Sequence, residues 1–166
     1  MTENEPNLAK LSEMIHYIIY KCGDNKDFGK TALWKILYFS DFNHYKNNFD
    51  AISNEEYRKI DFGPAPKHFD KVFEKLLANK KVDCQESKAE YETWKFKSLQ
   101  EPTFSFLKKE EIQTIDKVIK KLGHCKGSDL SNLSHEDNPW KASKFNEIID
   151  YGLVFYRSKA IEDRVE

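Results

Sequence analysis

The sequence predicts a mainly helical protein of the α+β class, built as one compact helical domain with a small antiparallel β-hairpin. Two observations predict this class: four segments carry apolar residues at helical spacing, and one pair of neighbouring segments alternates as a two-stranded hairpin does. The chain has 166 residues, of which 39% are hydrophobic and 14% aromatic, and this suffices for one core of ordinary size. We therefore treat residues 1–166 as a single domain that ends in a charged tail at 157–166.

The first two helices are predicted from their apolar patterns. Residues Asn7 to Cys22 repeat apolar side chains at helical spacing, and Gly23 supplies a stop. A second helix starts near Gly29 and runs to about Tyr45. Because it is apolar around more than half of its circumference, we expect it to be the central helix.

An irregular segment follows the second helix. Residues 52–60 favour irregular structure with a possible short strand. The sequence Phe-Gly-Pro-Ala-Pro at 62–66 can continue neither a helix nor an inner strand, because proline lacks the amide hydrogen that both need. We expect a rigid turn at Gly63-Pro64.

The next segment predicts a helix and then the hairpin. Residues 68–79 place their apolar side chains along one helical stripe. Residues 81–97 alternate as paired strands do, with a turn at Ser87-Lys88. This order of helix and hairpin is also that of a winged-helix module, so a winged-helix-like arrangement is a second possibility.

The last third of the chain is less regular. Residues 108–122 predict a fourth helix, and Ser128 is a plausible N-cap for a short fifth one. The sequence Asn-Pro-Trp at 138–140 interrupts that helix. Residues 145–156 are apolar but ambiguous between helix and strand, and the charged tail at 157–166 is expected to fray.

Composition bounds the environment of the protein. The three cysteines, Cys22, Cys84 and Cys125, are odd in number and far apart, so we expect reduced thiols. The longest strongly apolar stretch, near Ile15 to Tyr20, is far shorter than the ~20 residues that span a bilayer. The first residues lack the apolar segment of a signal peptide. We expect a cytoplasmic protein with no membrane partner.

Motifs for catalysis, nucleotides and metals are weak. The loop Gly23 to Thr31 is similar to a phosphate-binding loop, but five residues separate its glycines where the motif has four, and a helix precedes it. The scattered histidines, among them His44, His68 and His135, lack metal-ligand spacing. We expect no enzyme, no catalytic residue, no metal and no cofactor.

A DNA-binding regulator is the alternative function. The helix at 68–79 and the hairpin at 81–97 form the candidate unit, and Arg58 to Lys81 contains seven basic and three acidic residues. Against this stand Asp70 and Glu74 on the helix, and the lack of an arginine or glutamine in its first turn to contact a base edge. Nucleic acid is therefore the less favoured partner.

The sequence contains two landmarks, made of residues 33–42 (LWKILYFSDF), His44-Tyr45, Tyr57, 62–69 (FGPAPKHF), 130–135 (LSNLSH) and 139–141 (PWK). Together they resemble a known family, the Panacea domain or SocA-like antitoxins of bacteria and their phages. The family pattern is a K-L/I-L-Y-F-A-D helix, a G-P-V/A-P turn that leads into another helix, and then a leucine-serine helix with a tryptophan. The resemblance covers about residues 8–156, and Ser40 departs from the usual alanine.

The resemblance implies an antitoxin that neutralises a cognate toxin by direct protein–protein binding. It does not identify the toxin, because the family is paired with toxins of very different kinds. The oligomeric state is left open as well.

Residues of the two landmarks form the candidate partner-binding site. They are Trp34, Lys35, Tyr38, Asp41, Gly63, Pro64, His68 and Trp140. Lys35, Tyr38 and Asp41 follow one another at intervals of three and share a helical face, which could be a recognition surface beside the rigid turn. The alternatives are an internally paired Asp41, a Tyr38 that spans core and solvent, and tryptophans that fill the core. Leu37, Phe42, Phe69 and Phe73 are expected in the core.

Overall fold

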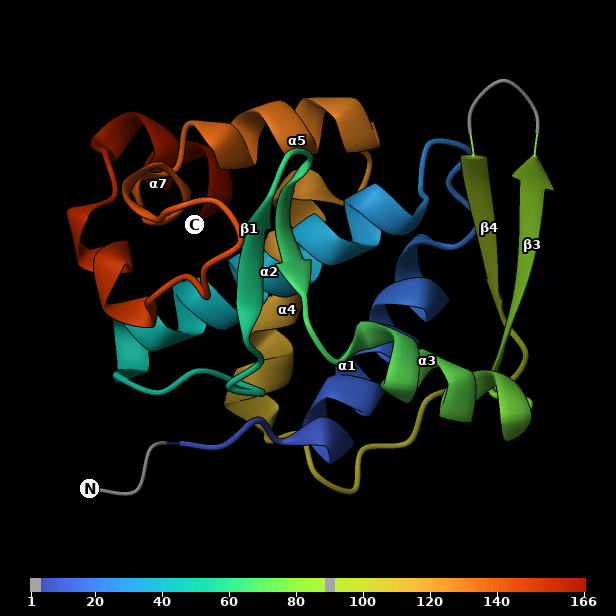
Figure 1. Cartoon of the computed structure of the whole chain (residues 1–166). Coiled ribbons are helices and arrows are strands. Elements are labelled where there is room, and N and C mark those ends of the chain that lie inside the picture. The colour runs from blue at the N-terminus through green and yellow to red at the C-terminus, as the bar shows by residue number, and fades with distance from the viewer. Residues whose placement is uncertain (1–3, 89–91) are drawn as a thin grey trace.

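The computed structural model describes residues 4–88 and 92–166 and confirms a mainly helical α+β fold (Figure 1). The elements in chain order are α1 (Leu8–Cys22), α2 (Lys30–Asn48), β1 (Tyr57–Ile60), β2 (Gly63–Pro66), α3 (Phe69–Ala78), β3 (Val82–Lys88), β4 (Glu92–Ser98), α4 (Lys109–Leu122), α5 (Gly127–His135), α6 (Asn138–Ala142), the 3₁₀ helix η1 (Tyr151–Tyr156) and α7 (Lys159–Val165). In Figure 1 the β3–β4 hairpin stands on one side of the molecule, and the C-terminal elements occupy the opposite side.

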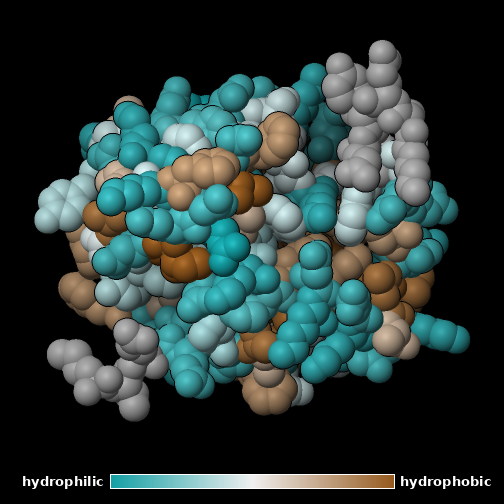
Figure 2. Space-filling view, in the orientation of Figure 1, coloured by the Kyte–Doolittle hydropathy of each residue, from teal (hydrophilic) through white to brown (hydrophobic). Residues whose placement is uncertain are grey.

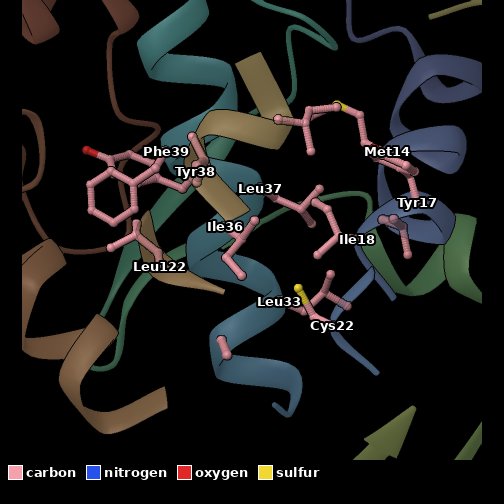
Figure 3. Packing of buried hydrophobic residues seen from close by; sticks show 14 of the residues in the cluster. Met14, Tyr17, Ile18, Cys22, Leu33, Ile36, Leu37, Tyr38, Phe39 and Leu122 are labelled. Atoms are coloured by element: carbon pink, nitrogen blue, oxygen red, sulfur yellow. The ribbon is translucent and has the colours of Figure 1, made fainter. Parts of the chain in front are cut away.

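Helix α2 is the central helix, as predicted from its apolar circumference. Twelve of its residues are buried, and α1, α4, α5, β2 and η1 all pack against it. Figure 3 shows Leu33 and Leu37 of α2 near Ile18 and Cys22 of α1, while Tyr38 lies toward Leu122 of α4. The four residues expected in the core are buried there: Leu37, Phe42, Phe69 and Phe73.

A second hairpin stands where a turn was expected. Its first strand, β1, confirms the possible short strand within 52–60, but its second strand was not predicted. Strands β1 and β2 pair antiparallel, with Tyr57 opposite Pro66 and Ile60 opposite Gly63. The expected turn at Gly63-Pro64 is therefore wrong, because both residues lie in β2. Prolines are tolerated there because β2 is an edge strand, whose outer side needs no amide donor.

The predicted hairpin at 81–97 is present, but its turn is not at Ser87-Lys88. Strand β3 continues through both residues, and Lys88 pairs with Glu92. Glu90 and Tyr91, predicted to begin the second strand, lie outside the described residues. Helix α3 precedes the hairpin as predicted, and its exposed residues mix acidic and basic side chains: Asp70, Lys71, Glu74 and Lys75.

The C-terminal quarter corrects several predictions. Helix α5 begins at Gly127 with Lys126 at the N-cap position, so Ser128 is not the cap. The Asn-Pro-Trp sequence starts the short helix α6, because proline fits the first turn of a helix. The ambiguous segment 145–156 is neither a helix nor a strand throughout: Ile148 bridges to Arg58 of β1, and η1 follows.

The tail does not fray. Residues 159–165 form α7, which buries Ile161 and Val165 against the core. Arg157, just before it, is also buried. Within residues 4–88 and 92–166, no helix combines the length and the apolar character that crossing a lipid bilayer would demand.

Candidate partner-binding site

The polar face predicted on α2 lies inside the protein. Lys35, Tyr38 and Asp41 each have 0% of their surface exposed. They can affect a partner only through the elements that they hold in place. Each of the three side chains binds a different neighbouring segment, and together they hold these segments against α2.

Lys35 holds strand β2. Its Nζ donates a hydrogen bond to the carbonyl oxygen of Pro64, at 3.1 Å. Gly63 has a φ of +104°, and a Cβ at this position would lie 2.6 Å from Cε of Lys35 and closer still to Oγ of Ser134. Only glycine fits here, for its backbone angle and for its lack of a side chain. Burial without a carboxylate partner lowers the pKa of Lys35 to about 7.

Asp41 is paired internally, as one of the alternatives proposed. Its carboxylate accepts hydrogen bonds from the amide and hydroxyl of Ser53, at 2.8 and 2.7 Å, and from the hydroxyl of Tyr57, at 2.6 Å. Burial raises the pKa of Asp41 to about 6, although these hydrogen bonds oppose the rise. Asp41 therefore anchors the segment between α2 and β1.

Tyr38 reaches a buried ion pair instead of solvent. Its hydroxyl donates to Oδ2 of Asp137 at 2.7 Å, and Arg157 binds the same carboxylate through two hydrogen bonds of 2.8 and 2.9 Å. Burial would lower the pKa of Arg157, but the hydrogen bonds and the charge of Asp137 outweigh it and raise that pKa. The pair joins α2 to the turn before α6 and to the C-terminal segment.

His68 and Pro64 belong to the same buried framework. His68 is half-buried at the beginning of α3, and its Nδ1 lies 2.6 Å from Oε1 of the fully buried Glu55. Glu55 also accepts a hydrogen bond from the amide of His68 at 2.8 Å. Pro64 is buried, with its carbonyl turned to Lys35.

The two tryptophans are partly exposed. Trp34 packs edge-on against Phe69, with ring centroids 5.6 Å apart. Trp140 lies against the ring of His135 at 4.2 Å, and the ammonium of Lys59 sits 4.0 Å from its centroid. Both contribute to the core, and each keeps one edge near the surface.

A groove of about 1110 Å³ opens next to these residues. Its lining comes from the loop before α2, the first residues of α2, helix α5 from Gly127 to His135, the turn between β1 and β2, and strand β4. We call it the α2–α5 groove. In Figure 1 the β1–β2 turn and β4 lie on either side of the beginning of α2. The loop that is similar to a phosphate-binding loop thus forms part of its wall.

The groove has a mixed lining. Lys26, Lys30 and Lys95 contribute positive charge, and Asp27 and Asp61 contribute negative charge. The ammonium of Lys30 lies 4.1 Å from the ring centroid of Trp94, also in the lining, and 4.8 Å from that of Trp34. Phe62, at the β1–β2 turn, is 70% exposed.

The rest of the visible surface is a mosaic. Figure 2 shows hydrophobic patches separated by hydrophilic side chains on the face seen in Figure 1. Exposed aromatic residues also gather at the other end of α2, where Phe49 stacks on Phe155 with centroids 5.5 Å apart. Among the described residues, no three His, Cys, Asp or Glu side chains cluster as a metal ion would require.

Several residues of this framework escaped the sequence reasoning. Asp137 and Arg157 carry no local pattern, since their pairing depends on the path of the chain between them. Glu55 and Ser53 were missed for the same reason. A usable signal did exist for Lys35 and Asp41: polar residues on a helix expected at the centre must be buried and paired.

Comparison with known proteins yields one match. A family model described as Antitoxin SocA-like, Panacea domain, matches residues 33–141. This range begins inside α2, holds all elements from β1 to α5 and ends inside α6, and it is shorter than the 8–156 estimated from the landmarks. No curated protein and no solved structure matches the chain.

Proposed function

The chain belongs to the SocA-like antitoxin, Panacea domain family, and on this premise we propose that it neutralises a cognate toxin by binding it directly. The family match over residues 33–141 is the observation that carries the proposal. The site that would make the contact is the α2–α5 groove with the turns around it. All eight residues predicted for partner binding lie within the matched range.

The internal framework supports a binding role for the groove. Lys35 and Gly63 fix the strand that follows the β1–β2 turn, and His68 and Glu55 fix the beginning of α3. The turn and the helix ends are thereby held before any partner arrives. A preformed surface loses less conformational entropy on association, which favours affinity.

We also propose that the chain works without catalysing a reaction. Ionisable groups with strongly shifted pKa values usually mark active sites. Here burial shifts the pKa of Lys35 to about 7 and that of Asp41 to about 6, and both side chains have 0% exposure. Their polar atoms bind the protein itself, so a substrate would have no access to them.

The test is co-expression with the reading frame next to this chain's own. We expect the neighbouring product to arrest growth when expressed alone, this chain to restore growth, and the two proteins to copurify. Rescue without a physical complex would contradict direct binding. Rescue accompanied by a mobility shift on the shared promoter, with no complex, would favour the DNA-binding alternative.

A further inference from the structure

We propose that the α2–α5 groove holds an acidic segment of the partner protein, with a carboxylate side chain near Lys26, Lys30 and Lys95. This inference rests on the proposed function and names the partner chemistry of its site. It is carried by the size of the groove, its charge and its aromatic walls.

The size of the groove suits a peptide segment. Its volume of about 1110 Å³ is at or above the upper end of the roughly 300–1,000 Å³ of small-molecule pockets. Four separate parts of the chain form its walls, so an occupant would contact all of them at once. A short stretch of polypeptide meets this description better than a single metabolite does.

The charge of the groove favours an anion. Three lysines face two aspartates. The beginnings of α2 and α5 lie close together, since a Cβ on Gly127 would be only 3.1 Å from Cβ of Thr31. Neither Gly29 nor Lys126, the two N-cap residues, supplies a side-chain acceptor. The partial positive charges of two helix ends therefore add to that of the lysines.

The aromatic walls provide apolar contact beside the charge. Phe62 is 70% exposed, and Trp94 presents one face to Lys30. Aromatic side chains with a nearby cation are typical of the residues that dominate protein–protein affinity. The favoured segment thus combines an acidic residue with an apolar neighbour.

The same lining disfavours nucleic acid. Asp27 and Asp61 would face a polymer that carries one negative charge at every nucleotide. A protein segment can place a single carboxylate near the lysines and leave the aspartates to neutral groups. The net charge of the chain is −1, which gives no general attraction for a polyanion.

The experiment compares two charge reversals of equal size. Lys26→Glu/Lys95→Glu changes two exposed lysines of the groove, and the matched control Lys117→Glu/Lys120→Glu changes two exposed lysines of α4. The probe is the purified product of the neighbouring reading frame, titrated at low and at physiological salt. We expect the groove variant to bind at least about tenfold more weakly and with a smaller salt dependence, and the control to stay within about twofold.

A milder variant guards against misfolding. Lys26→Gln/Lys95→Gln removes the charges without repulsion, and circular dichroism and the unfolding midpoint show whether each variant is folded. A partner variant in which one acidic residue becomes lysine should regain affinity for Lys26→Glu/Lys95→Glu, which only a direct charge contact explains.

The outcomes separate the two proposals. If the unmodified chain neither binds nor neutralises the neighbouring product, both fall. If it binds, and the groove variant binds equally well, the groove is not the binding site and the antitoxin role stands. If only Phe49→Ser/Phe155→Ser loses binding, the interface lies at the other end of α2 and not in the groove. If the groove binds only a short single-stranded oligonucleotide, the proposal that it holds an acidic protein segment is also overturned.

Discussion

The two ends of helix α2 are built in opposite ways. Toward its carboxyl end, most buried polar side chains find an internal partner: Tyr38 with Asp137, Asp41 with Ser53, and Asn43 with the carbonyl of Val165. The buried hydroxyl of Ser40 has none among the described residues. Toward its amino end the N-cap is Gly29, which has no capping side chain, and Lys30 is half exposed beside an open groove. One helix thus joins a closed framework to an open surface.

The difference separates stability from recognition. Paired polar groups in the interior specify one arrangement of the chain, because a half-satisfied network costs free energy. Polar groups around the groove keep their charge available, because water can still reach them. We therefore expect substitutions at the closed end to change stability, and substitutions at the open end to change binding.

The largest effect is expected at the buried ion pair. Arg157→Met leaves the carboxylate of Asp137 buried without its bidentate partner, and both side chains have 0% exposure. Removing one member of such a pair typically costs about 3–5 kcal/mol of unfolding free energy. Urea unfolding measures it. The control Lys159→Met breaks an exposed pair with Asp163 and should leave the midpoint almost unchanged. Equal midpoints for the two variants would refute the closed framework.

Gly63→Ala should have the next largest effect. The new Cβ would lie 2.6 Å from Cε of Lys35, at a φ of +104° that alanine rarely adopts. We expect a loss of about 2–4 kcal/mol in unfolding free energy, from strain and displaced packing together. Gly152→Ala is the matched control, because the nearest atom to its Cβ would be a side-chain oxygen of Asp150 at 3.3 Å. A Gly63→Ala variant as stable as that control would show that β2 can move away from α2.

Local patterns in the sequence predicted most of the helices. Apolar spacing located α1, α2, α3 and α4 within a few residues, because each buries one continuous stripe or, for α2, most of its surface. Long-range partners were not predictable in this way. Helix α7 buries only Ile161 and Val165, and Arg157 holds the segment before it through Asp137, twenty residues earlier in the chain. Such a long-range contact produces no periodic pattern in the sequence.

The second hairpin and the groove were missed for different reasons. Proline argues against strands in general, and β2 is an edge strand in which this argument does not apply. The groove gathers residues from five elements and loops, and only the folded chain brings Lys26 near Phe62. The resemblance named the right family and placed its residues, but it could not say which of them face inward.

Lys35→Met tests whether the buried charge of α2 is needed for stability. The pKa of Lys35 is about 7 in the folded chain, below its ordinary value of 10.5, so between these values the unfolded state binds more protons. The wild-type chain therefore gains stability as pH rises from 7 to 10.5. We expect the variant to be more stable by about 1–3 kcal/mol at pH 7, since methionine avoids the cost of burying an ammonium, while the carbonyl of Pro64 loses a donor.

That advantage should shrink toward pH 10.5, where Lys35 becomes neutral in the unfolded chain as well. Unfolding by urea at a series of pH values measures the difference between the two chains. A difference that stays constant across this range would mean that Lys35 is charged when folded and has a partner other than Pro64.

The smallest effect on stability is expected at Lys30. Its ammonium lies 4.1 Å from the centroid of Trp94, and a half-exposed contact of this kind contributes about 0.5–1 kcal/mol. Lys30→Ala should therefore change the unfolding free energy by no more than that, yet weaken binding of the neighbouring product severalfold. Lys30→Arg, which keeps the charge and can lie over the indole, should restore most of the affinity. If Lys30→Ala destabilises the fold as much as Arg157→Met does, the two ends of α2 are not separate in function, because the open end then also holds the chain together.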